Sequence, residues 1–368
     1  MTGHGGDIYT ASEKLGMAEE KIIDFSASIN PLGIPKTVIV DIKKNAANYR
    51  HYPDSEARQL ISHLAKIHRL NPEGIICGNG STELIYLVVR ALKPNRILIP
   101  APTFSEYERA CRMNGDLRVA SYKLKKENNF DINPDKFIAA MQGDRNFELQ
   151  TLNSELKCGM AFLCNPNNPT GRLIKKSDML KIADSAKRFK CYLVIDEAFI
   201  DFSPQNSMIG EVRNNPYLIV LRSMTKFYAL AGLRIGYSVF PLHIAEIMKK
   251  YKEPWTVNTP AQRAGMIAVR DVTYKHKTLS LIKKEKAFLK NGFKKLKIDY
   301  IPSSANYYLI RINNAQAVIS SLRKKGILVR SCHNFTGLDD SYIRIAVRNR
   351  KDNTLLLKEL ANLCRAWS

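Results

Sequence analysis

The stretch SMTKFYALAGLRIGY, which spans residues 223–237, is the most informative part of this chain. It places Lys226 three residues after a serine, Ser223, and eight residues before an arginine, Arg234. From residue 227 to residue 236 the only charged side chain is Arg234, so we expect Lys226 to be partly removed from water. Desolvation lowers the pKa of an amine and makes it a nucleophile toward an aldehyde. A single lysine is more often a solvated surface charge, but a hydroxyl and a guanidinium at these spacings favour an amine that works beside a bound anion.

Two upstream segments place polar groups next to apolar runs. Asp196 follows the apolar run 192–195, where a carboxylate can pair with the protonated nitrogen of a bound heterocycle or simply cap the next turn. Its neighbour Glu197 points to the other face of a strand. The sequence GNGSTE, residues 78–83, precedes an apolar helical run, and backbone amides at the start of a helix bind anions. This second signal is weak on its own, because many helices begin with small hydroxyl residues.

The composition limits the class of protein. With 368 residues, 45% of them hydrophobic, the chain can form one large and one smaller domain. No apolar stretch approaches the roughly 20 residues that span a bilayer, so we expect no membrane partner. The first residues show no charged segment followed by an apolar run, so we expect no signal peptide and a cytoplasmic protein. The seven cysteines and seven histidines show no Cys-x-x-Cys pair and no zinc-site spacing, which predicts reduced thiols and no metal site.

The net charge of +23 is high for a metabolic enzyme. It can indicate a nucleic-acid partner or an anionic substrate. It can also come from lysines on solvated helices, and the lysines of residues 283–297 follow such a helical pattern. We favour solvated helices and expect no nucleic-acid partner, because no nucleic-acid-binding motif accompanies the charge. A phosphorylated substrate would still benefit from a positive field.

Short apolar, β-branched runs alternate with longer amphipathic runs, a pattern typical of α/β proteins. We expect strands at 74–77, 97–100, 118–122, 160–164, 192–196, 218–222 and 236–240, and later at 307–312 and 342–347. We expect helices at 55–68, 82–92, 105–114 and 175–189, and a long helical stretch after residue 251. The polar segment 144–157 predicts a loop, and the Gly- and Pro-rich start of the chain predicts an arm or loop. We expect residues 46–254 to form a large domain, and residues 1–45 with 255–368 to form an N-terminal arm and a small C-terminal domain.

Together with the segment NPNNPTG at residues 165–171, these motifs resemble the pyridoxal-phosphate (PLP) enzymes of fold type I, in the class I/II aminotransferase group. The resemblance can be followed over nearly the whole chain. It implies a mostly parallel central sheet flanked by helices, with a smaller α+β second domain. It also implies that PLP is the cofactor, that Lys226 binds it covalently, and that Asp196 keeps its ring nitrogen protonated.

The same resemblance implies the other contacts of the cofactor. Phe104, in the segment PTF, would stack on the ring, although a plain core residue is the competing interpretation. Many relatives have a tyrosine at the position of Phe199, and that tyrosine binds the phenolic oxygen of the cofactor; here Asn168 is left for that contact. The cofactor phosphate would be bound by Gly80, Ser81, Thr82, Ser223 and Arg234.

Two further motifs concern the partner subunit and the substrate. The segment RHYPD, residues 50–54, resembles a motif whose tyrosine reaches the cofactor phosphate of the neighbouring subunit. It implies a homodimer with shared active sites and gives Tyr52 that role, whereas the segment alone reads as a turn. Arg344 resembles the arginine that clamps the α-carboxylate of a substrate in a bidentate manner. Arg348, four residues later, lies on the same face of an expected strand or is a surface charge.

Several segments resemble the branch of the family that decarboxylates threonine phosphate. These are residues 4–8, 24–33, 196–202, 254–258 and 330–335. This resemblance implies that a phosphorylated amino acid is the substrate, bound at its phosphate or carboxylate end by His4, Asn30, Asn168, Arg330 and Arg344. The expected reaction converts L-threonine O-3-phosphate to (R)-1-amino-2-propanol O-2-phosphate for cobalamin biosynthesis. The alternative is the neighbouring branch, which transaminates histidinol phosphate with 2-oxoglutarate. The two reactions differ in which Cα bond stands perpendicular to the cofactor ring, a matter of orientation that the sequence does not show.

Overall fold

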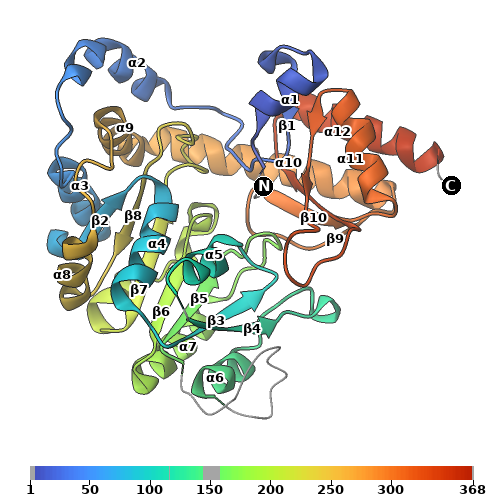
Figure 1. The fold of residues 1–368 in the computed structure, drawn as a ribbon. Helices are drawn as coiled ribbons and strands as arrows, with labels where there is room; N and C mark the ends of the chain where they lie inside the picture. The colour runs from blue at the N-terminus through green and yellow to red at the C-terminus, as the bar shows by residue number, and fades with distance from the viewer. Residues whose placement is uncertain (1–4, 116, 144–157, 367–368) are drawn as a thin grey trace.

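A seven-stranded sheet forms the centre of the computed structural model, which describes residues 5–115, 117–143 and 158–366 (Figure 1). The order of its strands is β2-β8-β7-β6-β5-β3-β4. The strands β4, β3, β5, β6 and β7 are parallel, and β8 runs antiparallel to both of its neighbours. The bounds are β2 (Ile75–Gly78), β3 (Arg96–Ala101), β4 (Arg118–Lys123), β5 (Met160–Cys164), β6 (Tyr192–Asp196), β7 (Leu218–Ser223) and β8 (Gly236–Val239).

Helices cover both faces of this sheet, as a mostly parallel sheet requires. Side chains alternate along β6: Leu193 and Ile195 belong to one hydrophobic cluster, and Val194 belongs to the other. Each fully buried aliphatic side chain of this kind contributes about 1.5–3 kcal/mol. The first cluster is covered by α3 (Arg58–His68), α6 (Pro134–Gln142), α7 (Lys176–Phe189) and α9 (Thr259–Arg270), and the second by α4 (Gly80–Leu92), α5 (Glu106–Arg112) and α8 (Leu242–Tyr251).

A smaller antiparallel sheet lies beside the large one, with the order β12-β13-β10-β9 (Figure 1). A third hydrophobic cluster joins it to its helices and includes Phe25, Leu289 and Ile343. The N-terminal segment belongs to this region, because β1 pairs in parallel with β11. The bounds are β1 (Ile23–Asp24), β9 (Asp299–Tyr300), β10 (Tyr307–Arg311), β11 (Ile327–Leu328), β12 (Arg330–Ser331), β13 (Tyr342–Ala346), α1 (Ile8–Leu15), α2 (Lys36–Asn45), α10 (Val272–Lys295), α11 (Ala315–Lys324) and α12 (Arg350–Ala366).

The structure confirms every strand that the sequence predicts and corrects some helices. The helix expected from residue 55 begins at Arg58, because Ala57 has a left-handed backbone with φ 55°. The start of the chain is not only an arm or loop, since it forms α1 and α2. The long helical stretch after residue 251 divides at Asp271, whose carboxylate accepts a hydrogen bond from the Tyr274 amide. The loop expected at 144–157 lies outside the described residues, and the domain boundaries stay a prediction. Within the described ranges no helix is long and apolar enough to cross a membrane.

Candidate active site

A cavity of about 400 Å³ lies where the carboxyl ends of the parallel strands meet the small sheet. Cys164, Asp196 and Ser223 line it from the ends of β5, β6 and β7. Arg330 and Arg344 line it from β12 and β13. The carboxyl ends of parallel strands are the usual place for ligands in open α/β sheets, and this volume is in the range of cofactor and substrate pockets.

Lys226 lies in the loop that follows β7, with its side chain at the cavity. Its pKa is lowered to about 8, first by burial and then by the positive charges of Arg344 and Arg234. The Lys226 carbonyl accepts a hydrogen bond from the Asn30 amide at 3.0 Å, which fixes the main chain at this point. A large fraction of the amine is therefore neutral near pH 8 and able to attack an aldehyde.

Donors for an anion gather at the start of α4. Ser81 and Thr82, in the first turn of α4, line the cavity together with Arg234 and Ser223. Gly80 has φ 73°, and a Cβ at this position would lie 2.4 Å from Nη2 of Arg234. Glycine thus lets the guanidinium lie directly against the helix. Amides at a helix start, hydroxyl groups and a guanidinium together make a phosphate site.

Asp196 is buried and has two hydrogen-bond donors. The Tyr107 hydroxyl donates to its Oδ2 at 2.7 Å, and the Ala198 amide donates to its Oδ1 at 3.0 Å. Burial raises the pKa of the Asp196 carboxyl, and these hydrogen bonds oppose the rise. Tyr107 itself is held by stacking on Phe162, with ring centroids 4.9 Å apart. No motif in the sequence indicates this tyrosine.

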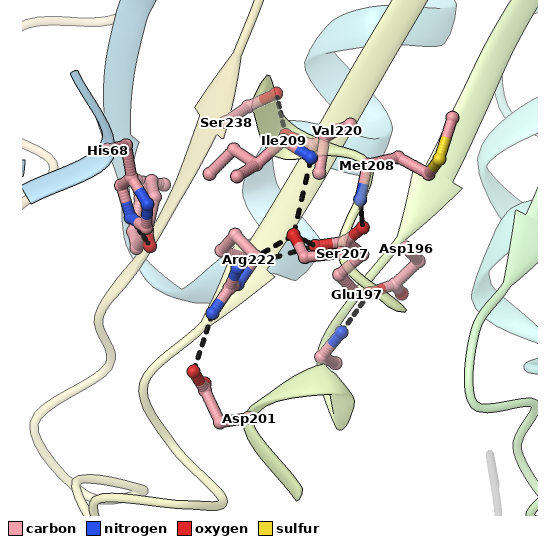
Figure 2. A network of polar contacts seen from close by, with 12 residues as sticks. His68, Asp196, Glu197, Asp201, Ser207, Met208, Ile209, Val220, Arg222 and Ser238 are labelled. Atoms are coloured by element: carbon pink, nitrogen blue, oxygen red, sulfur yellow. Dashed lines mark hydrogen bonds and ion pairs between the residues drawn. The ribbon is translucent and has the colours of Figure 1, made fainter. Parts of the chain in front are cut away.

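The opposite face of the same strand ends carries a buried ionic network (Figure 2). Glu197 accepts hydrogen bonds from the Ser207 hydroxyl and the Met208 amide, each at 2.6 Å. The Arg222 guanidinium contacts Glu197 at 3.3 Å and Asp201 at 2.5 Å. Glu197 therefore points away from the cavity, as its place after Asp196 predicts. Removal of one partner from a buried ion pair costs about 3–5 kcal/mol, so the network fixes the strand ends that carry Asp196 and Ser223.

Two arginines stand directly opposite each other on neighbouring strands of the small sheet. Arg330 of β12 pairs in register with Arg344 of β13. Arg344 donates to the Asn168 side-chain oxygen at 2.5 Å and to the Ser26 carbonyl at 2.8 Å. Arg330 donates to the Ser331 carbonyl at 2.7 Å and to the Asn334 side-chain oxygen at 2.8 Å. Burial, followed by the charge of Arg344, lowers the pKa of Arg330 to about 10.

These partners are all neutral, and within the described part of the chain neither guanidinium makes an ion pair. Two polar groups of the cavity also lack a partner among the described residues: the Nε of Arg344 and the hydroxyl of Ser28. The Ser28 side chain is only 1% exposed. A buried donor without a partner costs about 1–3 kcal/mol, so a ligand that accepts hydrogen bonds from these two groups would gain that free energy on binding.

The structure brings most of the expected site residues together. Gly80 does not line the cavity but lies against Arg234, which does. Tyr52 does not line it either and is 85% exposed on the surface. His4 lies outside the described residues, although its neighbour Gly5 lines the cavity. The cavity is lined by Ser81, Thr82, Phe104, Asn168, Asp196, Ser223, Lys226, Arg234, Arg330 and Arg344.

Asn30 does not line the cavity. Its side-chain nitrogen, which carries two N–H groups, lies within hydrogen-bond distance of the Phe227 carbonyl at 2.8 Å, the Tyr274 hydroxyl at 2.9 Å and the Thr278 hydroxyl at 2.7 Å. These contacts tie the N-terminal segment to α10 and to the loop of Lys226. The segment 24–33 does reach the cavity, but through Ala27 and Ser28. Sequence reasoning did not single out Glu106 and Arg109, which line the cavity from α5. It quoted the segments 223–237 and 330–335 but gave no role to their cavity-lining residues Thr225 and Phe335.

Comparison with known proteins identifies the family. The model of the family "Aminotransferase class I and II" matches residues 20–360. The chain belongs to this aminotransferase family. It is therefore a PLP-dependent enzyme with the fold type I architecture that the motifs predict.

Relatives within the family carry two activities in their names. The chain is 36% identical to threonine-phosphate decarboxylase of Salmonella typhimurium, with 98% of this chain and 96% of the relative covered. It is 31% identical to histidinol-phosphate aminotransferase of Methanococcoides burtonii, with 98% and 95% covered. Among solved structures, histidinol-phosphate aminotransferase from Clostridium acetobutylicum has a TM-score of 0.84 at 32% identity, with 94% of this chain and all of that chain covered. L-threonine-O-3-phosphate decarboxylase from Porphyromonas gingivalis has a TM-score of 0.79 at 25% identity, with the same coverage.

The residues of the cavity fit the cofactor of the family. The donors at the start of α4 and Arg234 match its phosphate, and the close approach that Gly80 permits is the kind of contact a phosphate site needs. The partly neutral amine of Lys226 matches its aldehyde. The Asp196 carboxylate matches its ring nitrogen.

Proposed function

We propose that this chain decarboxylates L-threonine O-3-phosphate to (R)-1-amino-2-propanol O-2-phosphate for cobalamin biosynthesis. The observation that carries the proposal is the pair of opposed arginines, Arg330 and Arg344, whose partners are all neutral oxygens. Like charges directly opposite each other on neighbouring strands are destabilising. Burying them at a cavity is reasonable if the ligand supplies negative charge, and threonine phosphate has two anionic groups on adjacent carbons.

The donors of the cavity can be divided between these two groups. Arg344 is already oriented by Asn168 and Ser26, and its free Nε makes it suitable for the carboxylate. Arg330 and the unpartnered Ser28 hydroxyl are suitable for the phosphate. Gly5 brings the N-terminal arm to the same place, which agrees with the role that the sequence suggests for His4.

With PLP bound, its ring withdraws electrons from the Cα atom of the substrate. Decarboxylation then requires that the bond from Cα to the carboxylate stand perpendicular to the ring plane, and two anion anchors can hold the substrate in that orientation. Asp196 keeps the ring nitrogen protonated. Phe199 offers no hydroxyl to the phenolic oxygen, which leaves Asn168 for that contact. Lys226 lines the cavity, and its amine would return a proton to Cα after CO₂ leaves.

The alternative is transamination of histidinol phosphate with 2-oxoglutarate, which the names of other relatives favour. Phosphate binding does not separate the two functions, because both substrates carry a phosphate. The deciding experiment offers each substrate separately to the purified PLP-loaded protein. CO₂ release from threonine phosphate without a keto acid would support the decarboxylase. Glutamate formation that requires histidinol phosphate, with no CO₂ from threonine phosphate, would overturn it.

We further propose a homodimer in which Tyr52 completes the cofactor site of the partner subunit. The support is the match of residues 50–54 to the family motif and the position of Tyr52 on the surface. The Tyr52 ring packs against Trp255 at a tilt of 40°, with ring centroids 5.5 Å apart, and Trp255 is itself 52% exposed. Two large exposed aromatic rings in contact are typical of a surface that another protein covers.

A further inference from the structure

The turn that follows β1 is built around one carboxylate, that of Asp24. Its Oδ1 accepts hydrogen bonds from the Ser26 amide at 2.7 Å, the Ser26 hydroxyl at 2.6 Å and the Ala27 amide at 3.3 Å. An aspartate that binds amides two and three residues later fixes the main chain into a tight turn. The turn points the next residues, Ala27 and Ser28, toward the cavity.

Ser26 connects the N-terminal arm to Arg344. Its own amide and hydroxyl are both hydrogen-bonded to Asp24. Its Oγ accepts a hydrogen bond from the Gly6 amide at 2.8 Å, and its carbonyl accepts one from Nη2 of Arg344 at 2.8 Å. The arm packs so closely here that a Cβ at Gly5 would lie 2.3 Å from the Ser26 carbonyl oxygen. The orientation of Ser26 therefore determines where the arm lies, and it determines the position of the carbonyl to which the Arg344 guanidinium donates.

We propose that Asp24 is a positioning residue for substrate binding: it fixes Ser26 and through Ser26 holds the arm at Gly5 and Gly6, the Ser28 hydroxyl and the Arg344 guanidinium around the cavity. None of the donors to the cofactor phosphate depends on this turn. Asp24 should therefore act mainly on the substrate, and its one effect at the cofactor site is electrostatic, because its charge raises the pKa of Lys226. The inference rests on the proposed function only for the identity of that substrate.

Four variants test the inference. Asp24→Ala removes the acceptor, and Asp24→Asn keeps an acceptor oxygen at the same place without the charge. Ser26→Ala removes the link to Gly6 and the hydroxyl bond to Asp24, but keeps the Ser26 amide and carbonyl. The control is Asp339→Ala, because Asp339 accepts hydrogen bonds from the amide and hydroxyl of Ser341 in the same Asp-x-Ser arrangement on the surface. The cavity lining does not include Asp339 or Ser341.

The first measurement is steady-state kinetics of the PLP-loaded enzyme with threonine phosphate. We expect Asp24→Ala to raise KM by roughly tenfold or more, the loss expected when hydrogen bonds to a charged group are removed, with little change in kcat or PLP affinity. Asp24→Asn, which keeps the acceptor oxygen but loses the charge, should raise KM less than Asp24→Ala, and Asp339→Ala should stay close to the unchanged enzyme. An unchanged KM in Asp24→Ala, or equal damage in Asp24→Asn, would overturn the inference.

The second measurement, amide hydrogen exchange of residues 5–15 in the absence of substrate, does not depend on which reaction the enzyme performs. Exchange should speed up in Asp24→Ala and, at Gly6, in Ser26→Ala, but not in the control. If the arm exchanges at the same rate in all variants, the inference fails even when the decarboxylase activity is confirmed. If the arm is loosened but threonine phosphate is never a substrate, the proposed function fails and the turn keeps its positioning role for the true substrate.

Discussion

The position of Asp196 depends on its neighbours in the sequence, whereas its hydrogen bond to Tyr107 depends on a residue far away in the chain. It ends a buried strand because it follows an apolar run, which the sequence reveals directly. Its hydroxyl partner Tyr107 lies 89 residues earlier, on α5, and meets it only because α5 packs on the sheet. Ser28 is similar: the sequence pointed to its segment but not to the side chain that reaches the cavity. Short-range motifs can therefore predict the residues that bind the cofactor, while the residues that orient them depend on packing.

The first prediction concerns the role of Asp196. Replacing it with Asn or Ala should leave PLP bound, because Lys226 and the phosphate donors are untouched. Turnover should fall by at least about a hundredfold, since the ring nitrogen loses the carboxylate that keeps it protonated. The measurement is turnover of the loaded enzyme together with its visible absorbance. Near-normal turnover in Asp196→Ala would contradict the assignment of Asp196 to the ring nitrogen.

The second prediction concerns Tyr107→Phe. Burial already raises the pKa of Asp196, and loss of the Tyr107 hydrogen bond removes one of the contacts that oppose the rise. The carboxyl should then be protonated at higher pH, so the loss of activity on acidification should begin at a higher pH than in the unchanged enzyme. Tyr308→Phe is the control, because the Tyr308 hydroxyl donates to the Lys286 carbonyl away from the cavity. Superimposable pH profiles of activity for Tyr107→Phe and Tyr308→Phe would contradict the role of Tyr107.

The third prediction concerns the pH dependence of Lys226. Its pKa is lowered to about 8 by burial and by the charges of Arg344 and Arg234. The rate at which the cofactor-free protein captures PLP should therefore rise as the pH rises through about 8 and level off above it, because only the neutral amine attacks. Arg344→Gln should move the midpoint upward, and Arg311→Gln, on the surface, should not. Borohydride trapping of PLP on Lys226 at each pH gives the rate, and a midpoint near the ordinary lysine value of about 10.4 would contradict this account.

The sequence predicts the strands of this protein better than it predicts the ends of its helices. The inner strands of the large sheet are buried on both faces, so each appears as a short apolar run between turns, and the half-exposed edge strand β4 is recognised by its β-branched and aromatic residues. Helix ends depend on single backbone conformations such as the left-handed Ala57, and these leave little trace in the sequence. The helix α1 begins at the cap provided by Asp7 and buries only Ala11, so its apolar pattern is too weak to distinguish it from an arm.

The fourth prediction tests the start of α4. Gly80→Ala places a Cβ 2.4 Å from Nη2 of Arg234, so the guanidinium must move away from the phosphate site. We expect PLP affinity to fall by roughly tenfold or more, the equivalent of about 1.4 kcal/mol. Gly33→Ala is the matched control, because Gly33 has φ 72° against 73° at Gly80 and nothing lies within 4 Å of a Cβ there. The two variants share the backbone strain, and equal PLP affinity in both would show that the Arg234 contact is unimportant.

At the scale of the whole molecule, the cavity is assembled from distant parts of the chain. The bond from Arg344 to Ser26 joins residues 318 positions apart, and the Tyr307 hydroxyl donates to the Asn167 carbonyl across 140 positions. Pairing of β1 with β11 brings the N-terminal segment to the small sheet, and a pairing of two residues has no sequence signature. The general architecture was predictable from the order of the motifs. The contacts that close the cavity were not, because they depend on how the two sheets are placed.

The last prediction concerns the dimer. If Tyr52 acts in the partner subunit, the protein should sediment at twice 41.7 kDa, and Tyr52→Phe should weaken PLP binding while the ring contact with Trp255 is kept. Mixing two impaired variants tests directly whether Tyr52 acts across the interface. Tyr52→Phe chains retain Lys226, and inactive Lys226→Ala chains retain Tyr52, so a mixed dimer contains one complete site only if Tyr52 crosses the interface. Activity at limiting PLP should then rise when the two variants are unfolded and refolded together, and it should not rise when each is refolded alone. A monomer that is fully active at catalytic dilution, or a mixture no more active than its parts, would place Tyr52 outside the partner's site.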